Sequence, residues 1–385
     1  MKDQKHWETE FLEKIARKFS WVNEKIYAPY VYAVDKKGRY FQSENPAYSW
    51  VCGFYGGIQW WMYSLTGERK YYDKAIEISE WMDENLVTMG SISHDLGFQY
   101  LLTTIPDYLQ TGVERARRSS IHAACLLAGR FNYAGNYLRA WDDNKYIDPD
   151  NSKAGYVIID SMMNLPLLFW ATNETHDPRF KQIACAHANT IMKTFIRENG
   201  SSEHIVVFDP ETGVVLEKPR GQGYAPGSSW TRGQAWAIYG FSMAFHYTGD
   251  RGYFDTAFKV AEYYMRRLDN QKLPPVDFDQ PMEPDLKDAS ASAIAACGLI
   301  ELKKWANETQ KEVLEDWIVR LLHGLYSDCD FSETNEAVLQ NCKQMYHEPP
   351  EQTSLIYADF YLLEALMKRN GFSFVFEENR NCKGS

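Results

Sequence analysis

The sequence predicts an all-α fold, an (α/α)6 toroid in which inner and outer helices alternate along the chain. Two observations predict it. Helix-turn-helix units recur, and their clearest turns lie in L-T-G-E-R-K-Y-Y from Leu65, T-H-D-P-R-F-K from Thr175 and Y-T-G-D-R-G-Y-F from Tyr247. Each of these turns follows an apolar segment rich in small residues, and six such segments occur. Six inner and six outer helices would close a ring with a funnel at one end.

The six apolar segments are the expected inner helices. In chain order they lie near Cys52–Ser64, Leu96–Leu109, Ile159–Ala171, Thr231–Tyr247, Ser290–Lys304 and Ile356–Lys368. Their glycine, alanine and serine residues let neighbouring helices approach closely. The helices between them, such as Tyr72–Met82 and Tyr253–Leu268, carry charge on one face, as expected of the outer ring.

The chain is expected to form one domain, residues 1–385, because no Ser/Gly-rich linker divides it. A short strand is expected near His204–Phe208, as an excursion from the rim of the ring. An open helical solenoid is the alternative architecture, but it would not require the repeats to stop at six.

Composition excludes several classes of protein. A net charge of -11 argues against nucleic acid as a partner, since phosphate binding relies on basic surface. No run of about 18 apolar residues predicts a membrane span, and the charged start M-K-D-Q-K-H-W-E lacks the apolar core of a signal peptide. The odd number of scattered cysteines argues against structural zinc or a disulfide framework, so a cytoplasmic location is expected. They are Cys52, Cys125, Cys185, Cys297, Cys329, Cys342 and Cys382.

The stretch Gly221–Phe241, G-Q-G-Y-A-P-G-S-S-W-T-R-G-Q-A-W-A-I-Y-G-F, is the most informative segment. It places Arg232 between two tryptophans where the fourth inner helix should begin, with Ser228 or Ser229 as its N-cap. Arg232 and Trp236 are four residues apart and share a helix face, so both can address one anionic sugar. The alternative is that the tryptophans are core residues and Arg232 a buried ion-pair partner.

Two aspartates stand at the starts of inner helices and are the expected catalytic pair. Asp95 lies in S-H-D-L-G-F at the second inner helix, and Asp160 lies in Y-V-I-I-D-S-M-M-N-L-P at the third. Apolar surroundings favour a protonated carboxyl, which general acid catalysis needs. N-capping is the alternative role for both. Asp288, before the fifth inner helix, is expected to be a cap rather than a catalyst.

Several other residues near these helix starts could bind substrate. Trp50 precedes the first inner helix, His94 adjoins Asp95, and His204 lies in S-S-E-H-I-V-V-F-D. Trp141, in L-R-A-W-D-D-N, could be a rim platform for a second sugar, and Gln222 could donate hydrogen bonds. A structural role is the alternative for each of these residues.

Taken together, S-H-D-L-G-F, I-I-D-S-M-M-N-L-P-L-L-F-W-A, S-S-W-T-R-G-Q-A-W-A-I-Y-G-F and D-A-S-A-S-A-I-A-A-C-G-L resemble the unsaturated glucuronyl hydrolases, glycoside hydrolase family eighty-eight. The resemblance covers nearly the whole chain from Trp50 onward. It implies an (α/α)6 barrel that acts on the unsaturated uronates left by polysaccharide lyases. The implied reaction hydrates the C4=C5 vinyl ether, so ordinary displacement stereochemistry does not apply.

The resemblance also implies roles for individual residues. The aspartate matching Asp160 protonates C4 and assists water attack at C5, and the one matching Asp95 contacts ring hydroxyls. Trp50 is implied to stack on the uronate and Trp141 to hold the next sugar. Further pocket residues implied around the uronate are His204, Gln222, Arg232 and Trp236.

The sequence departs from the family in two places. Gly221 stands where members carry His or Arg, with Arg220 adjacent, and the segment Tyr346–Thr353 lacks the S-x-x-S-x-K pattern linked to sulfated substrates. A preference for sulfated disaccharides is therefore not expected from these positions.

The leading hypothesis is a hydrolase of unsaturated glucuronyl oligosaccharides that needs no metal or cofactor and binds no nucleic acid or membrane. An unsaturated rhamnogalacturonyl hydrolase shares the mechanism and fold and is the main alternative. A sugar epimerase on the same toroid is less favoured, because that chemistry usually uses paired histidines. A non-catalytic binding protein is less favoured again. The sequence does not indicate the oligomeric state.

Overall fold

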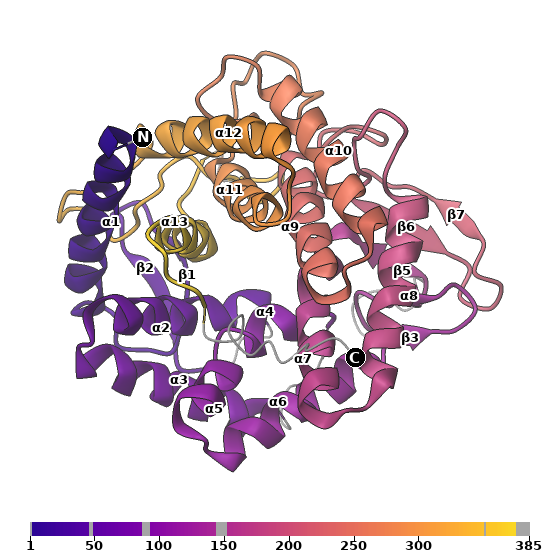
Figure 1. Ribbon diagram of the computed structural model, residues 1–385, viewed down its shortest axis with the longest axis horizontal. Helices are drawn as coiled ribbons and strands as arrows, with labels where there is room; N and C mark the ends of the chain where they lie inside the picture. The colour runs from indigo at the N-terminus through magenta and orange to yellow at the C-terminus, as the bar shows by residue number, and fades with distance from the viewer. Residues whose placement is uncertain (1, 46–48, 87–92, 144–151, 350–351, 375–385) are drawn as a thin grey trace.

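Two concentric rings of helices make up the computed structural model, which describes residues 2–45, 49–86, 93–143, 152–349 and 352–374 (Figure 1). The inner positions hold α2 (Phe54–Thr66), α4 (Leu96–Tyr100) with α5 (Thr104–Thr111), α7 (Leu165–Thr175), α9 (Thr231–Thr248), α11 (Ala289–Lys303) and α13 (Ile356–Arg369). The outer helices are α3 (Arg69–Leu86), α6 (Glu114–Ala128), α8 (Pro178–Thr194), α10 (Arg251–Leu268), α12 (Glu308–Tyr326) and α1 (Lys2–Asn23). The predicted (α/α)6 toroid is confirmed.

The ring is closed by the two ends of the described chain. Helix α1 packs on α13 as its outer partner, and α13 also packs on α2. Arg369 at the end of α13 pairs with Glu8 of α1 at 2.6 Å. The open solenoid is therefore wrong, because the last inner helix returns to the first.

Two of the expected inner helices are interrupted, each near a proline. Pro106 has no N–H and its ring excludes the carbonyl of Leu102, so the second inner position divides into α4 and α5. The third begins as a 3-10 helix, η2 (Ile159–Asn164), and becomes α-helical at Leu165, where Pro166 occupies the first turn. A shorter 3-10 turn, η1 (Trp50–Gly53), leads into α2.

Small residues let the inner helices touch backbone to backbone, as expected. A Cβ added to Gly298 of α11 would lie 2.8 Å from the Cα of Tyr239 on α9. A Cβ on Gly240 of α9 would lie 2.4 Å from the Cβ of Met162 in η2. Since real side chains do not approach so closely, these two positions require glycine.

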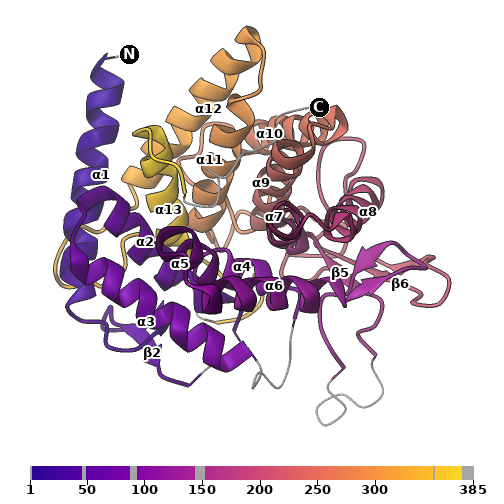
Figure 2. The same ribbon diagram turned by 60° about the horizontal axis from the view of Figure 1, so that its bottom comes forward.

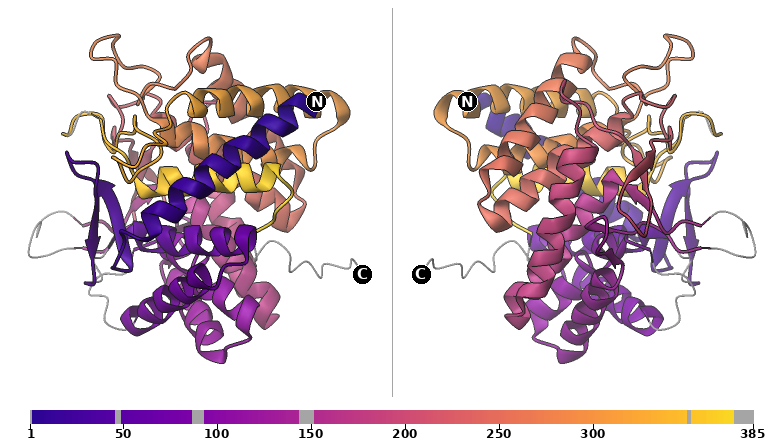
Figure 3. Two further views of the ribbon diagram at one scale, coloured as in Figure 1. Left: turned by 90° about the vertical axis from the view of Figure 1, so that its left-hand side faces the viewer. Right: turned by 90° about the vertical axis from the view of Figure 1, so that its right-hand side faces the viewer.

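Short antiparallel strands lie at one end of the ring (Figures 2 and 3). The expected strand near residues 204–208 is confirmed as β6 (Ile205–Phe208), which pairs with β5 (Tyr156–Ile158) and β7 (Val215–Glu217). The remaining pairs are β1 (Tyr30–Val34) with β2 (Tyr40–Ser43), and β3 (Phe131–Asn132) with β4 (Tyr137–Leu138).

Backbone hydrogen bonds bring the starts of the inner helices together at this end. The N–H of Thr231 donates to the Val276 carbonyl at 3.0 Å, and the N–H of Ala289 donates to the Asn341 carbonyl at 2.7 Å. Each bond links one helix start to the loop that leads to the next inner helix. Residues at these starts therefore face a common space. Within the described ranges, no helix combines the length and the apolar character needed to cross a bilayer.

Candidate active site

Asp95 and Asp160 stand at two neighbouring helix starts, and neither serves as a cap. Asp95 occupies the N-cap position of α4, but its Oδ2 accepts from Ser93 Oγ at 2.6 Å and takes no helix N–H. Asp160 lies in the first turn of η2, and its buried Oδ2 has no hydrogen-bond partner. Because capping engages neither side chain, both carboxylates remain available for other contacts.

A histidine accompanies each aspartate. His94 Nε2 lies 3.4 Å from Asp95 Oδ1, and His204 Nε2 lies 3.6 Å from Asp160 Oδ2. The backbone N–H of Gln222 donates to His204 Nδ1 at 2.9 Å, so the neutral ring carries its hydrogen on Nε2, facing Asp160.

Among the described residues, several buried polar atoms of this cluster make no hydrogen bond. Besides Asp160 Oδ2, they include His204 Nε2 and both ring nitrogens of His94. Buried polar groups are normally hydrogen-bonded, and an exception needs an explanation. A polar ligand such as a sugar, with its hydroxyl groups, would satisfy all of them.

The electrostatics of the cluster couple the two carboxyl groups. Burial raises the pKa of Asp95 above its ordinary value, while His94 and the Ser93 hydroxyl act in the opposite direction. The charge of Asp160 raises the same pKa further. Burial also lowers the pKa of His94, although the Asp95 charge opposes that shift.

Aromatic rings surround the cluster. The Trp50 ring is half-buried and contacts Phe98 and Tyr357, with centroids 5.2 Å and 4.6 Å away. Trp236 is fully buried behind it, 6.4 Å away and nearly perpendicular. The half-buried Trp141 ring stands edge-on to His94 at 6.5 Å. Trp50 and Trp141 are thus accessible to a sugar, whereas Trp236 supports the wall.

Arg232 is bound by other parts of the protein. It forms an ion pair with Asp288, and its two terminal nitrogens donate to the carbonyls of Lys343 and Gln344, each at 2.6 Å. Its guanidinium also stacks 4.5 Å from the Trp230 ring centroid. Burial alone would lower its pKa, but the charges of Asp288, Tyr357 and Asp160 raise it overall. The alternative of a buried ion pair therefore describes Arg232.

Asp288 and the two serines differ from their expected roles as caps. Asp288 occupies the N-cap position of α11, but its carboxylate accepts from Ser290 Oγ at 2.5 Å and pairs with Arg232. The N-cap of α9 is Trp230, which makes no side-chain cap. Ser228 Oγ instead donates to Asp277 Oδ2 at 2.6 Å, and Ser229 Oγ lies 2.9 Å from the Tyr263 hydroxyl. Capping by Ser228 or Ser229 is therefore wrong.

The backbone conformation at position 221 and the nearby His204 ring require a glycine there. Gly221 has φ +62°, and a Cβ there would lie 1.9 Å from His204 Nδ1. Any side chain would displace the histidine from its bond to Gln222. The Gln222 amide donates to the Gln344 carbonyl at 3.1 Å, while Arg220 is exposed.

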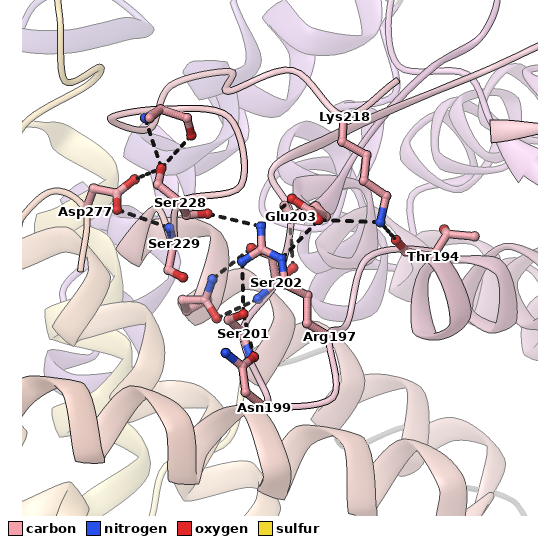
Figure 4. A network of polar contacts seen from close by, with 12 residues as sticks. Thr194, Arg197, Asn199, Ser201, Ser202, Glu203, Lys218, Ser228, Ser229 and Asp277 are labelled. Carbon is pink, nitrogen blue, oxygen red and sulfur yellow. Dashed lines mark hydrogen bonds and ion pairs between the residues drawn. The ribbon is translucent and has the colours of Figure 1, made fainter. Parts of the chain in front are cut away.

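A polar network fixes the loop before α9 against the segment that carries His204 (Figure 4). Arg197 pairs with Glu203 and donates to the Ser228 carbonyl at 3.2 Å. The buried Asp277 accepts from Ser228 Oγ and from the N–H groups of Tyr224 and Ser229. These bonds hold His204 and the Gln222 loop in register.

The structure brings together all nine residues expected at the site, although Trp236 and Arg232 lie behind its surface. It also adds residues that sequence reasoning did not select, namely Ser93, Trp230, Tyr357, Lys343 and Gln344. Tyr357 could have been found, because it lies at the start of the sixth inner helix. The carbonyls of Lys343 and Gln344 carry no sequence signal.

Comparison with known proteins supports the fold described above. The family model described as Glycosyl Hydrolase Family 88 matches residues 22–361. The chain is 33% identical to an unsaturated glucuronyl hydrolase of Bacillus sp. (strain GL1), over 87% of this chain and 89% of that protein. It is 30% identical to an unsaturated chondroitin disaccharide hydrolase of Streptococcus pneumoniae (strain ATCC BAA-255 / R6), over 83% and 81%. A solved structure of the Bacillus sp. GL1 unsaturated glucuronyl hydrolase superposes with a TM-score of 0.88 at 30% identity, covering 99% of this chain and 100% of that one.

Similarity to these proteins in sequence and in fold identifies the protein as a glycoside hydrolase. Its sequence places it more narrowly: the chain belongs to glycosyl hydrolase family 88.

Proposed function

We propose that this enzyme releases the unsaturated 4,5-dehydro-uronate from the non-reducing end of lyase-generated oligosaccharides. The observation that carries the proposal is the Asp95 and Asp160 pair with its two histidines, His94 and His204. In the described structure, buried Asp160 Oδ2 and buried ring nitrogens of both histidines make no hydrogen bond. The names of the relatives, which act on unsaturated glucuronyl and chondroitin substrates, support this choice of substrate.

The proposed reaction adds water across the C4=C5 bond. Asp160 gives its proton to C4, and the carboxylate so formed takes a proton from the water whose oxygen bonds to C5. The resulting hemiketal opens and releases the aglycone. Asp95 accepts hydrogen bonds from ring hydroxyls, and His204 Nε2 donates toward Asp160 or the substrate.

Substrate binding is assigned to the residues around this pair. Trp50 stacks on the uronate, Trp141 holds the following sugar, and His94 contacts the ring hydroxyls. Gln222 acts through its backbone N–H on His204. Arg232 and Trp236 shape the pocket from behind, and the guanidinium of Arg232 supplies the positive charge that attracts the uronate carboxylate.

The experiment is Asp160→Asn, assayed by the loss of ultraviolet absorbance of the unsaturated uronate. We expect kcat to fall about 100- to 10,000-fold, the usual contribution of a positioned acid or base. Asp73→Asn on the exposed face of α3 is the matched control and should keep the unmutated rate. If Asp160→Asn also kept that rate, the assignment would be wrong.

A panel of unsaturated disaccharides from chondroitin, hyaluronan, heparin and pectin identifies the aglycone. Sulfated and unsulfated forms should be compared, because Gly221 adds no side chain to the pocket and the neighbouring Arg220 is exposed. Residues 350–351 of the Tyr346–Thr353 segment lie outside the described ranges. Six cysteines lie within the described residues and none of them forms a disulfide there, which supports a reducing compartment such as the cytoplasm.

A further inference from the structure

His187 is a fully buried histidine that the proposed reaction does not use. It lies on the outer helix α8, and its side chain is closed off from solvent. Burial lowers its pKa to about 3, so the ring stays neutral under ordinary conditions. A neutral imidazole has one donor and one acceptor nitrogen, and both are engaged here.

The hydrogen-bond directions around His187 follow from its neighbours. The backbone N–H of Leu138 can only donate, and it lies 2.9 Å from His187 Nδ1, so Nδ1 carries no hydrogen. The ring hydrogen is therefore on Nε2, which lies 2.6 Å from Ser161 Oγ. Ser161 accepts that bond and sends its own hydrogen to the Ile158 carbonyl at 2.6 Å.

One end of this series of hydrogen bonds lies next to Asp160. Ser161 is the next residue in η2, and Ile158 is the last residue of β5, which pairs with β6 beside His204. The bonds through Ser161 thus fix the 3-10 turn that presents the Asp160 carboxylate.

The other end reaches Asp95. Two residues beyond Leu138, the Ala140 carbonyl accepts the N–H of His94 at 3.0 Å. Ala140 also donates its own N–H to the Tyr156 carbonyl in β5 at 2.8 Å. The same imidazole therefore supports the backbone segments that present both carboxylates.

We propose that His187 is a positioning residue that sets the placement of Asp95 relative to Asp160, acting through Leu138 and Ser161. The inference rests on the proposed function. No substrate contact is assigned to His187 itself, so its effect appears in turnover rather than in binding.

Three variants test the two arms, which are the hydrogen-bond path from His187 through Ser161 to Asp160 and the path from His187 through Leu138 to Asp95. Ser161→Ala removes the arm to Asp160, and His187→Asn keeps an acceptor for the Leu138 N–H but cannot reach Ser161. His187→Gln places a donor near Ser161 instead. Because a displacement of about 1 Å can cost about 100-fold in rate, we expect kcat to fall about 10- to 100-fold in Ser161→Ala and His187→Asn, with KM within about twofold. His187→Gln should recover the part of the loss that depends on the bond to Ser161, and the remaining loss measures the contribution of the bond to Leu138.

Ser242→Ala is the matched control. Ser242 is also buried and also donates to a backbone carbonyl, that of Ile238 at 2.7 Å, but within the described structure no hydrogen bond joins it to a histidine. It should lose stability as Ser161→Ala does while keeping kcat. The proposal is overturned if kcat of Ser161→Ala stays within about twofold of this control, or if His187→Gln is no better than His187→Asn. Failure of the proposed function is recognised separately, by an unmutated rate in Asp160→Asn.

Discussion

Asp359 is a single residue whose burial makes the stability of the whole protein depend on pH. It is fully buried on α13 and accepts from the Tyr40 hydroxyl and from the N–H groups of Val338 and Leu339 at 2.6 to 2.9 Å. Burial raises its pKa to about 6, against about 3.9 in an unfolded chain. The folded state therefore holds this proton more tightly than the unfolded state.

The sign of the effect follows from that difference. The contribution of Asp359 to stability is fully present below about pH 4 and is lost as the pH rises through about 6. We expect the unfolding free energy of the wild type, relative to Asp359→Asn, to fall by about 2 to 3 kcal/mol between about pH 4 and pH 7. Urea unfolding at each pH measures this difference. Asp255→Asn, at an exposed position on α10, should show no such trend. If the difference in unfolding free energy between the wild type and Asp359→Asn did not change with pH, the prediction would be wrong.

At the same scale, the sequence predicts which residues reach the site better than it predicts their partners. Asp95 and Asp160 could be predicted because helix starts converge in a toroid. The partners of Arg232 could not, since Asp288 lies 56 residues away and the Lys343 carbonyl lies 111 residues away. A backbone carbonyl has the same chemistry in every residue, so no residue type marks it.

At the scale of elements, the contact between α4 and η2 determines how the two aspartates approach. A Cβ on Gly97 would lie 2.4 Å from the Cα of Asn164. Asn164 accepts from the Phe98 N–H at 2.8 Å and donates weakly to the Asp160 carbonyl at 3.4 Å. Gly97 therefore lets the segment after Asp95 lie directly against the turn that carries Asp160.

Gly97→Ala should push these two elements apart. We expect it to cost about 1 to 3 kcal/mol in unfolding free energy, as overpacking usually does, and to lower kcat at least about tenfold. Gly129→Ala is the control, because Gly129 has φ -62° and its nearest contact would lie at 3.4 Å. Calorimetry and the absorbance assay report the two effects. An unchanged kcat in Gly97→Ala would show that the contact does not set the site.

The elements themselves were predictable where periodicity and small residues agree. All six inner positions and the strand β6 follow the sequence pattern. The break between α4 and α5 and the 3-10 turn η2 were not expected. Pro106 and Pro166 mark both places in the sequence, yet a proline is also tolerated in the first turn of a helix, so the residue alone does not distinguish a start from a break.

At the scale of the whole molecule, closing the ring depends on contacts between the two ends of the described chain, which sequence repeats cannot show. Thr9 of α1 donates to Asn370 at 2.8 Å, and Arg369 joins α1 to α12 and α13. Figure 3 shows α1 lying across α13 and α12 at this junction. The repeat count indicates six hairpins, but only these tertiary bonds make the first helix the partner of the last.

Arg369 is the centre of that closure and the place to test it. Its guanidinium pairs with the buried Glu8 at 2.6 Å and with Glu315 at 2.7 Å, and Arg369→Gln would leave Glu8 buried without its cation. We expect a loss of about 3 kcal/mol, the lower end for breaking a buried pair, since Glu315 keeps Lys303. Hydrogen exchange should then speed up first in α1, because that helix has lost its main polar link to α13. Arg251→Gln removes an exposed pair on α10 and should cost less than about 1 kcal/mol. Uniformly faster exchange across all helices, with no lead in α1, would mean that the ring unfolds as one unit and that this junction does not control it.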